Sequence, residues 1–168
     1  MIKLIVCAGP NGELGLNNEL IYHNKRDMKF FREQTKENIV IMGKNTFKSL
    51  GSKPLPDRIN IVLTEEEDFY PGVLTWNMPL ENALRTATAW FPMLDIYIIG
   101  GAYVYNQAIE QKLADEMLLT QMYQRKEADT FIDMTKINEN YYMENLIDIL
   151  SDEDDMAIIY RLVRREEE

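Results

Sequence analysis

Short apolar runs recur along most of the chain, and their order is the feature that most constrains its fold. The first run is rich in β-branched residues and ends at Gly9-Pro10, which is typical of a buried strand, and NIVIMGK is also predicted to be a buried strand. Through the first two-thirds of the chain, most of these runs alternate with helical patterns, which predicts a parallel sheet flanked by helices. The eight predicted strands are IKLIVCA (2–8), NIVIMGK (38–44), RINIVLT (58–64), GVLTW (72–76), DIYIIGG (95–101), EMLLTQMY (116–123), YYMENLIDIL (141–150) and MAIIYRLVRR (156–165).

The last third of the chain has a different pattern, because strands dominate there. The final two predicted strands are joined only by the acidic segment SDEDD, which predicts an antiparallel hairpin at one edge of the sheet. We therefore expect an α/β fold with a mixed, mostly parallel eight-stranded sheet, about four flanking helices and this C-terminal hairpin, in one domain of residues 1–168. The four helices are expected at 27–36, 45–51, 79–90 and 102–112.

Composition excludes several classes of function. The net charge of −10 argues against a nucleic-acid-binding protein, which needs a concentrated basic surface. A single cysteine and a single histidine exclude an internal disulfide and make a Cys- or His-based metal site implausible, so we expect no metal. No apolar run approaches the roughly 20 residues of a membrane span. We expect a cytoplasmic monomer whose acidic tracts are solvated, and which meets any anionic ligand through local positive groups.

The segment GPNGELGLNNEL (9–20) has no apolar periodicity and is rich in glycine and asparagine. We expect a long loop here. Loops of this length in small domains are frequently functional.

The helix that follows places a carboxylate among apolar side chains. In NKRDMKFFREQT (24–35), Asp27 and Phe31 are four residues apart and share a helix face, with Met28 beside them. A first-turn or N-cap aspartate favoured by the helix dipole explains this placement without any function. A ligand-binding carboxylate is the alternative, and the helix pattern alone favours the first explanation.

Two segments join a buried strand to a helix through glycine: VIMGKNTF (40–47) and YIIGGAYVY (97–105). Free N–H groups at a helix N-terminus can bind phosphate, and glycine allows close approach of the ligand. Neither segment is a GxGxxG or Walker motif, so each alone is better explained by an ordinary strand-to-helix turn, whereas two such turns from neighbouring parallel strands would suit a pyrophosphate. Lys44, Thr46 and Thr64 are candidate phosphate or ribose contacts.

Taken together, these motifs resemble the dihydrofolate reductase family over nearly the whole chain. The matching pieces are Leu14-Gly15, Asp27 with Phe31, VIMGKNTFKSLG, PLPDR, NIVLT, IIGGAYVY, LLT and EADTF. The resemblance implies reduction of 7,8-dihydrofolate to 5,6,7,8-tetrahydrofolate by hydride transfer from NADPH, with Asp27 anchoring the pterin through two hydrogen bonds and water delivering the proton. It also implies that antifolate-type inhibitors bind.

The resemblance further assigns roles to individual residues. Arg58 is expected to pair with the glutamate tail of the substrate, Asp129 to steady the lid of residues 9–24, and Gly100-Gly101 to carry a cis peptide bond. The expected catalytic residues are Asp27, Tyr22, Leu20 and Thr120. The expected substrate-binding residues are Ile5, Met28, Phe31, Leu50, Leu55, Arg58 and Ile99. The expected cofactor-binding residues are Cys7, Leu14, Gly15, Gly43, Lys44, Asn45, Thr46, Leu63, Thr64, Gly100, Gly101, Ala102, Tyr103, Val104 and Tyr105.

The chain departs from the family pattern in two regions. LIYHN (20–24) replaces the usual Leu-Pro-Trp, and Tyr22 keeps an aromatic body with a polar tip that suits the water usually held by the tryptophan. Near the ribose, Glu65 stands where a hydroxyl or basic residue is common, and Tyr103 replaces a frequent arginine. An acid there would favour NADH, although NADPH remains the expected cofactor.

Two other functions fit the same motifs less well. A reductase of the same fold acting on another pterin or a ribosylaminopyrimidine does not require Asp27, Phe31, Arg58 and Thr120 together. A non-catalytic folate or nucleotide binder does not require an intact carboxylate. Replacement of Asp27 by asparagine separates catalysis from a purely structural role.

Overall fold

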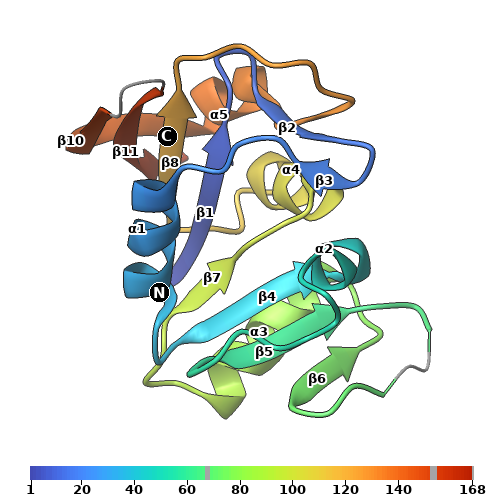
Figure 1. Ribbon diagram of the computed structural model, residues 1–168. Helices are drawn as coiled ribbons and strands as arrows, with labels where there is room; N and C mark the ends of the chain where they lie inside the picture. The colour runs from blue at the N-terminus through green and yellow to red at the C-terminus, as the bar shows by residue number, and fades with distance from the viewer. Residues whose placement is uncertain (67–68, 152–154, 168) are drawn as a thin grey trace.

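A large mixed sheet forms the centre of the protein. The computed structural model describes residues 1–66, 69–151 and 155–167, and its eight-stranded sheet has the order β10-β11-β8-β1-β7-β4-β5-β6 (Figure 1). Five adjacent strand pairs are parallel, from β8 through to β6, and the two pairs that involve β11 are antiparallel. The strands are β1 (Ile2–Ala8), β4 (Ile39–Gly43), β5 (Ile59–Leu63), β6 (Val73–Trp76), β7 (Ile96–Ile98), β8 (Glu116–Met122), β10 (Tyr141–Ser151) and β11 (Met156–Arg164). The predicted mixed sheet and edge hairpin are confirmed.

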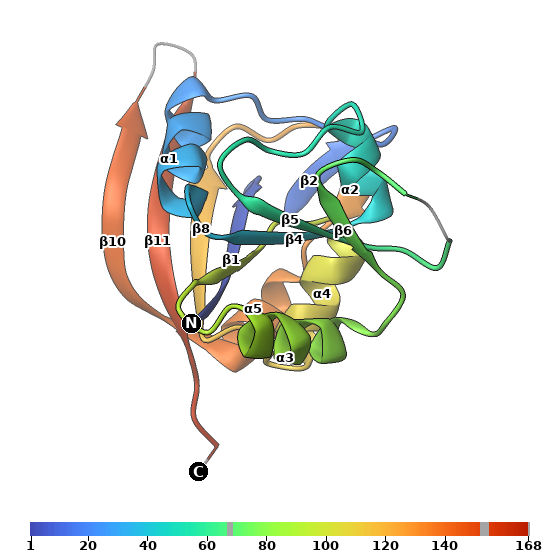
Figure 2. The same ribbon diagram turned by 90° about the horizontal axis from the view of Figure 1, so that it is seen from below.

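Helices cover both faces of this sheet, as Figure 2 shows. Helices α1 and α2 lie on one face, and α3, α4 and α5 lie on the other. Their bounds are α1 (Lys25–Thr35), α2 (Lys44–Ser49), α3 (Leu80–Trp90), α4 (Ala102–Glu110) and α5 (Met134–Asn140). Four correspond to the predicted helices. The fifth, α5, was not predicted, because its seven residues are mostly polar and carry little helical periodicity.

The segment expected to be a long loop contains secondary structure. Strands β2 (Glu13–Leu16) and β3 (Glu19–Leu20) join β9 (Thr130–Phe131) in a separate three-stranded sheet. The expectation of an unstructured loop was therefore wrong for these residues. Strands this short have no readable alternation, and the β2–β9 pairing joins segments more than 100 residues apart in the sequence.

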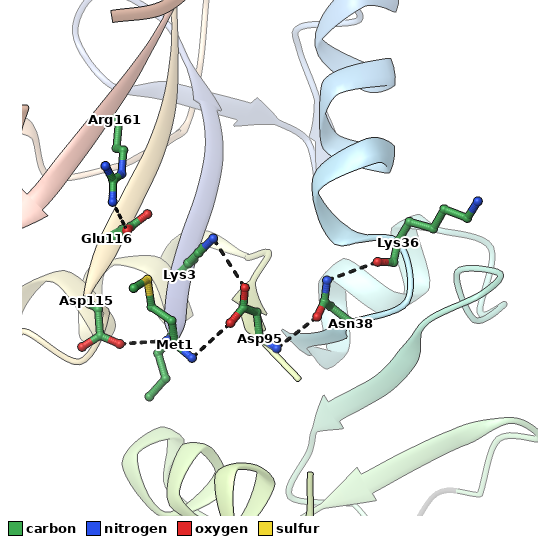
Figure 3. A network of polar contacts seen from close by, with 9 residues as sticks. Met1, Lys3, Lys36, Asn38, Asp95, Asp115, Glu116 and Arg161 are labelled. Carbon is green, nitrogen blue, oxygen red and sulfur yellow. Dashed lines mark hydrogen bonds and ion pairs between the residues drawn. The ribbon is translucent and has the colours of Figure 1, made fainter. Parts of the chain in front are cut away.

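The amino-terminal ends of the central strands are fixed by polar contacts (Figure 3). The backbone N–H of Ile2 donates to Asp115 at 2.8 Å, and Asp95 pairs with Lys3 at 3.5 Å. On β8, Glu116 forms an ion pair with Arg161. These contacts tie β1, β7, β8 and β11 together at one end of the sheet, which leaves the opposite, carboxyl ends of the parallel strands for binding chemistry.

The acidic tracts fall only partly within the described structure. Residues 67–68 of the TEEEDF segment, residues 152–154 of the hairpin connection and residue 168 lie outside the described residues. Among the residues that are described, no helix has the length and hydropathy needed to cross a membrane.

Candidate active site

Asp27 and Thr120 meet where α1 crosses the carboxyl end of β8. Asn24 caps α1 by accepting the N–H of Asp27 at 2.9 Å. The carboxylate of Asp27 is therefore not the helix cap, although it lies in the first turn. It accepts a hydrogen bond from the Thr120 hydroxyl at 2.5 Å, across 93 residues of sequence. A capping role is therefore excluded for this side chain, while its first-turn position, which the helix dipole favours, is retained.

The electrostatics of Asp27 reflect its position between core and surface. Burial raises the pKa of Asp27 above its ordinary value, while the hydrogen bond from Thr120 acts in the opposite direction. Cys7 is opposite Thr120 in the β1–β8 register. The pKa of its thiol is raised well above the ordinary value, first by burial and then by the Asp27 charge, so Cys7 is a packed thiol rather than a nucleophile.

One apolar cluster lies beside this carboxylate. Its buried members include Ile5, Val40 and Phe47, and aromatic side chains from α1 pack against it. The residues expected to bind substrate that belong to it are Ile5, Phe31, Leu50, Leu55 and Ile99. Phe30 also packs there, although it was not among the residues expected to bind substrate. Met28 is 57% exposed and lies outside the cluster, so its role stays a prediction.

Arg58 lies at the edge of this cluster, just before β5. Its Nε donates to the Pro56 carbonyl at 2.8 Å, and its Nη1 donates to the Thr35 hydroxyl at 3.0 Å. These bonds use two of the five guanidinium donors and hold the side chain in a fixed direction. Burial lowers the pKa of Arg58 and the neighbouring Asp57 raises it, but an arginine remains charged throughout the working pH range.

Two glycine turns lie side by side at the ends of β4 and β7. The N–H of Gly43 donates to the Gly100 carbonyl at 2.9 Å, so the turns before α2 and α4 touch. The peptide between Gly100 and Gly101 is cis, as expected. A side chain would be crowded at both positions, because an added Cβ would lie 3.1 Å from the Thr46 hydroxyl at Gly101 and 3.3 Å from the Tyr105 ring at Gly100. The backbone here forms a cradle that suits a close-lying pyrophosphate.

Other residues expected at the cofactor site surround these turns. Lys44 forms an ion pair with Glu66, and the buried Thr64 hydroxyl accepts the Glu66 N–H at 3.1 Å. Glu65, the acid expected near the cofactor ribose, is exposed. The Tyr105 hydroxyl donates to the Ile5 carbonyl at 2.8 Å, which links the cofactor side to β1. Gly43 ends β4 and caps α2, Leu63 ends β5, Asn45 lies in α2, and Ala102, Tyr103 and Val104 form the first turn of α4.

The lid of residues 9–24 is held by the chain that follows β8. The backbone N–H of Asn17 donates to the Asp129 carboxylate at 3.0 Å, and the Asp129 N–H donates to the Gly15 carbonyl at 2.9 Å. Leu14 is buried, whereas Leu20 is 62% exposed. These contacts agree with the expected role of Asp129.

Tyr22 is buried, and its hydroxyl is directed toward this same segment. It donates to the Gln124 carbonyl at 2.8 Å and lies 3.4 Å from the Glu13 carboxylate. Its role in holding a water stays a prediction. Sequence reasoning missed Glu13 and Gln124. Glu13 stands out only because it is buried, and Gln124 only because its carbonyl lies close to the Tyr22 hydroxyl. Neither property is visible in a linear motif.

Comparison with known proteins agrees with this geometry. The family model for dihydrofolate reductase matches residues 1–164. A dihydrofolate reductase of Haemophilus influenzae is 35% identical over 129 residues, covering 77% of this chain and 76% of the relative. One from Ureaplasma parvum is 31% identical over 153 residues, covering 88% and 92%.

A solved structure extends the match to three dimensions. Dihydrofolate reductase from Enterococcus faecalis, complexed with NADP(H) and RAB-propyl, superposes with a TM-score of 0.85 at 27% identity, covering 99% of this chain and 97% of that one. The family match, the relatives and the carboxylate site at the carboxyl ends of the strands agree, and the chain belongs to the dihydrofolate reductase family.

Proposed function

We propose that this protein reduces 7,8-dihydrofolate to 5,6,7,8-tetrahydrofolate with NADPH, and that Asp27 is the group that anchors the pterin. The observation that carries the proposal is the half-buried Asp27 carboxylate, fixed by Thr120 beside an apolar cluster. A carboxylate in this setting can accept two N–H donors from a 2-amino-pyrimidine edge. The apolar side chains around it exclude water and so strengthen these bonds.

The remaining substrate contacts follow from the same geometry. Phe31, Leu50, Leu55 and Ile99 offer apolar surface to the pterin and the ring that follows it. Arg58 has guanidinium donors beyond the two that hold it, and these suit a carboxylate of the glutamate tail. Met28 and Leu20 are exposed and would contact the substrate from the outer side of the site.

The two touching glycine turns fit a dinucleotide. The cradle at Gly43, Gly100 and Gly101 would hold the pyrophosphate, with Thr46 beside it, while Lys44 and Thr64 would hold the phosphate-bearing ribose. When bound, NADPH supplies the hydride for the C=N carbon of the dihydropteridine. Cys7, Leu14 and Tyr105 would border the nicotinamide, and the protein's main contribution there is to orient the two rings.

Proton delivery is assigned to water rather than to Asp27. In the anchored pose Asp27 contacts the pyrimidine edge, away from the nitrogen that gains the proton, and it tunes the basicity of the ring from there. The lid formed by β2 and β3 controls entry of that water. We further propose that the protein acts as a cytoplasmic monomer and does not bind nucleic acid, since its net charge of −10 opposes phosphate backbones.

Nicotinamide absorbance tests the proposal directly. Purified protein is mixed with dihydrofolate and either NADPH or NADH at equal concentration, with dihydrofolate omitted as the control. We expect oxidation that depends on dihydrofolate and is faster with NADPH. Folded protein that oxidises neither cofactor would contradict the proposed reaction, while faster oxidation of NADH would contradict only the choice of cofactor.

A further inference from the structure

Glu13, at the start of β2, is a buried carboxylate that the proposed reaction does not use. Its side chain is only 2% exposed. Charged side chains are rarely buried this deeply unless they have partners. One carboxylate oxygen accepts the Asn11 N–H at 2.9 Å, and the other lies 3.4 Å from the Tyr22 hydroxyl. The lid thus carries its own buried acid, aimed at the aromatic residue of the same lid.

The contact between Glu13 and Tyr22 requires the glycine at position 9. A Cβ on Gly9 would lie 2.0 Å from the Glu13 carboxylate oxygen and 2.2 Å from the Tyr22 hydroxyl. Both distances are far below van der Waals contact, and both side chains are buried. Gly9, Glu13 and Tyr22 therefore form one interlocked unit, in which the carboxylate and the hydroxyl together occupy the space a side chain at position 9 would take.

This unit connects the lid to the catalytic carboxylate. The Tyr22 hydroxyl donates to the Gln124 carbonyl at 2.8 Å, and Lys126 lies over the Tyr22 ring, 5.3 Å from its centroid. The ring of Tyr22 belongs to an apolar cluster against which Cys7 and Phe30 pack, and the Cys7 thiol interacts with the Asp27 carboxylate. Burial, and then the Glu13 charge, raise the pKa of Tyr22 to about 12, so the phenol keeps its proton at neutral pH and stays a hydrogen-bond donor.

We propose that Glu13 is a positioning residue for the reductase reaction: as a second, longer acceptor for the Tyr22 hydroxyl that donates to the Gln124 carbonyl, it helps to hold the lid against the segment after β8 and so sets the alignment for hydride transfer. The inference rests on the proposed function. Glu13 itself does not touch substrate or cofactor. Its effect is expected on the rate of the hydride step and not on substrate affinity.

A double-mutant cycle tests this coupling. Single-turnover hydride transfer is measured by stopped-flow absorbance for Glu13→Val, Tyr22→Phe and the double variant. We expect each single change to slow the step about tenfold, the size expected when a buried polar partner is lost. The double variant should lose no more than either single one, and KM for dihydrofolate should stay within about twofold. Losses that multiply to about a hundredfold would contradict the proposal.

Two matched variants separate positioning from general damage to the lid. Glu13→Gln keeps an acceptor for the Asn11 N–H and offers a donor to the Tyr22 hydroxyl, so it should retain the rate within about twofold. Glu19→Val makes the same apolar change at an exposed acid on β3 of the same lid and should also retain it. A loss in Glu19→Val equal to that in Glu13→Val would overturn the assignment.

Gly9→Ala provides a readout that does not depend on turnover. In the wild-type background, Gly9→Ala should lower the folding equilibrium constant at least about tenfold, because the added methyl group overpacks the unit. Denaturant unfolding measures this constant. In the Glu13→Val/Tyr22→Phe background, Gly9→Ala should lower the folding equilibrium constant less than about threefold, because both oxygens that the new methyl group would meet have been removed. Equal costs in both backgrounds would overturn the interlock. Wild-type protein without turnover would instead contradict the proposed function.

Discussion

The two ends of the candidate site differ in the groups that line them: side chains at one end and mainly backbone at the other. At the proposed pterin end, the half-buried carboxylate of Asp27 on α1 accepts a hydrogen bond from the Thr120 hydroxyl on β8, beside an apolar cluster. At the proposed cofactor end, two glycine turns touch each other, and an ion pair joins the half-buried Lys44 to the exposed Glu66. In the proposed function, recognition of the pterin thus depends on a few side chains, whereas recognition of the pyrophosphate depends mainly on backbone groups, which most side-chain substitutions outside the glycines leave in place.

The largest effect is expected for Asp27→Asn. Loss of a charge-assisted, two-bond anchor should lower kcat/KM for dihydrofolate by about 10²-fold or more, while the fold is retained. Steady-state kinetics measure the change, with circular dichroism as a check of folding. Glu33→Gln, at an exposed acid on the same helix, is the control and should change little. A comparable loss in Glu33→Gln would assign the effect to α1 as a whole.

A smaller effect is expected at the tail of the substrate. Arg58→Gln should raise KM for dihydrofolate about tenfold with kcat nearly unchanged, because the guanidinium contributes binding alone. A dihydropterin that lacks the glutamate tail should not distinguish the variant from the wild type. Arg85→Gln, at an exposed arginine on the other face of the sheet, serves as the control. Equal effects on substrates with and without the tail would remove Arg58 from this role.

At the cofactor end we expect changes of a few-fold. Glu66→Gln removes a carboxylate that competes with a phosphate for Lys44, so the ratio of KM for NADH to KM for NADPH should rise by about two- to fivefold, the scale of an ion pair with one exposed partner. Glu65→Gln, at the adjacent exposed acid, tests whether the neighbouring charge matters equally. A larger effect at Glu65 would reverse the assignment that the Lys44–Glu66 pair suggests.

The smallest effect is a pH dependence of stability. Burial raises the pKa of Asp27, so the folded state holds this proton more tightly than the unfolded state does. The resulting stabilisation of the folded state is complete below about pH 4 and is lost as the pH rises through the folded-state pKa. Asparagine cannot lose a proton there. The melting temperature of Asp27→Asn should therefore rise relative to that of the wild type as pH increases toward neutrality. A difference that stays constant with pH would contradict the raised pKa.

The parallel part of the large sheet was predictable because β1, β4 and β5 are short apolar runs that are mostly buried, and the edge hairpin was predictable because two strand-like segments are joined only by a short acidic connection. Helix α5 and the small β2–β3–β9 sheet were not, since their segments are short and polar and are defined by pairing across the chain. The shared helix face of Asp27 and Phe31 drew attention to this carboxylate, but only the resemblance to the family gave it a binding role, because a first-turn aspartate explains the pattern equally simply. Glu13 was not, because its burial and its dependence on Gly9 exist only in three dimensions.

Binding, measured without turnover, tests the central claim most directly. Dihydrofolate and NADPH are titrated separately into the wild type and Asp27→Asn, and the dissociation constants are determined by fluorescence quenching. The account predicts that Asp27→Asn weakens dihydrofolate by more than about tenfold and leaves NADPH within about twofold, because only the pterin end depends on that carboxylate. Unchanged affinity for dihydrofolate, or equal losses for both ligands, would contradict it.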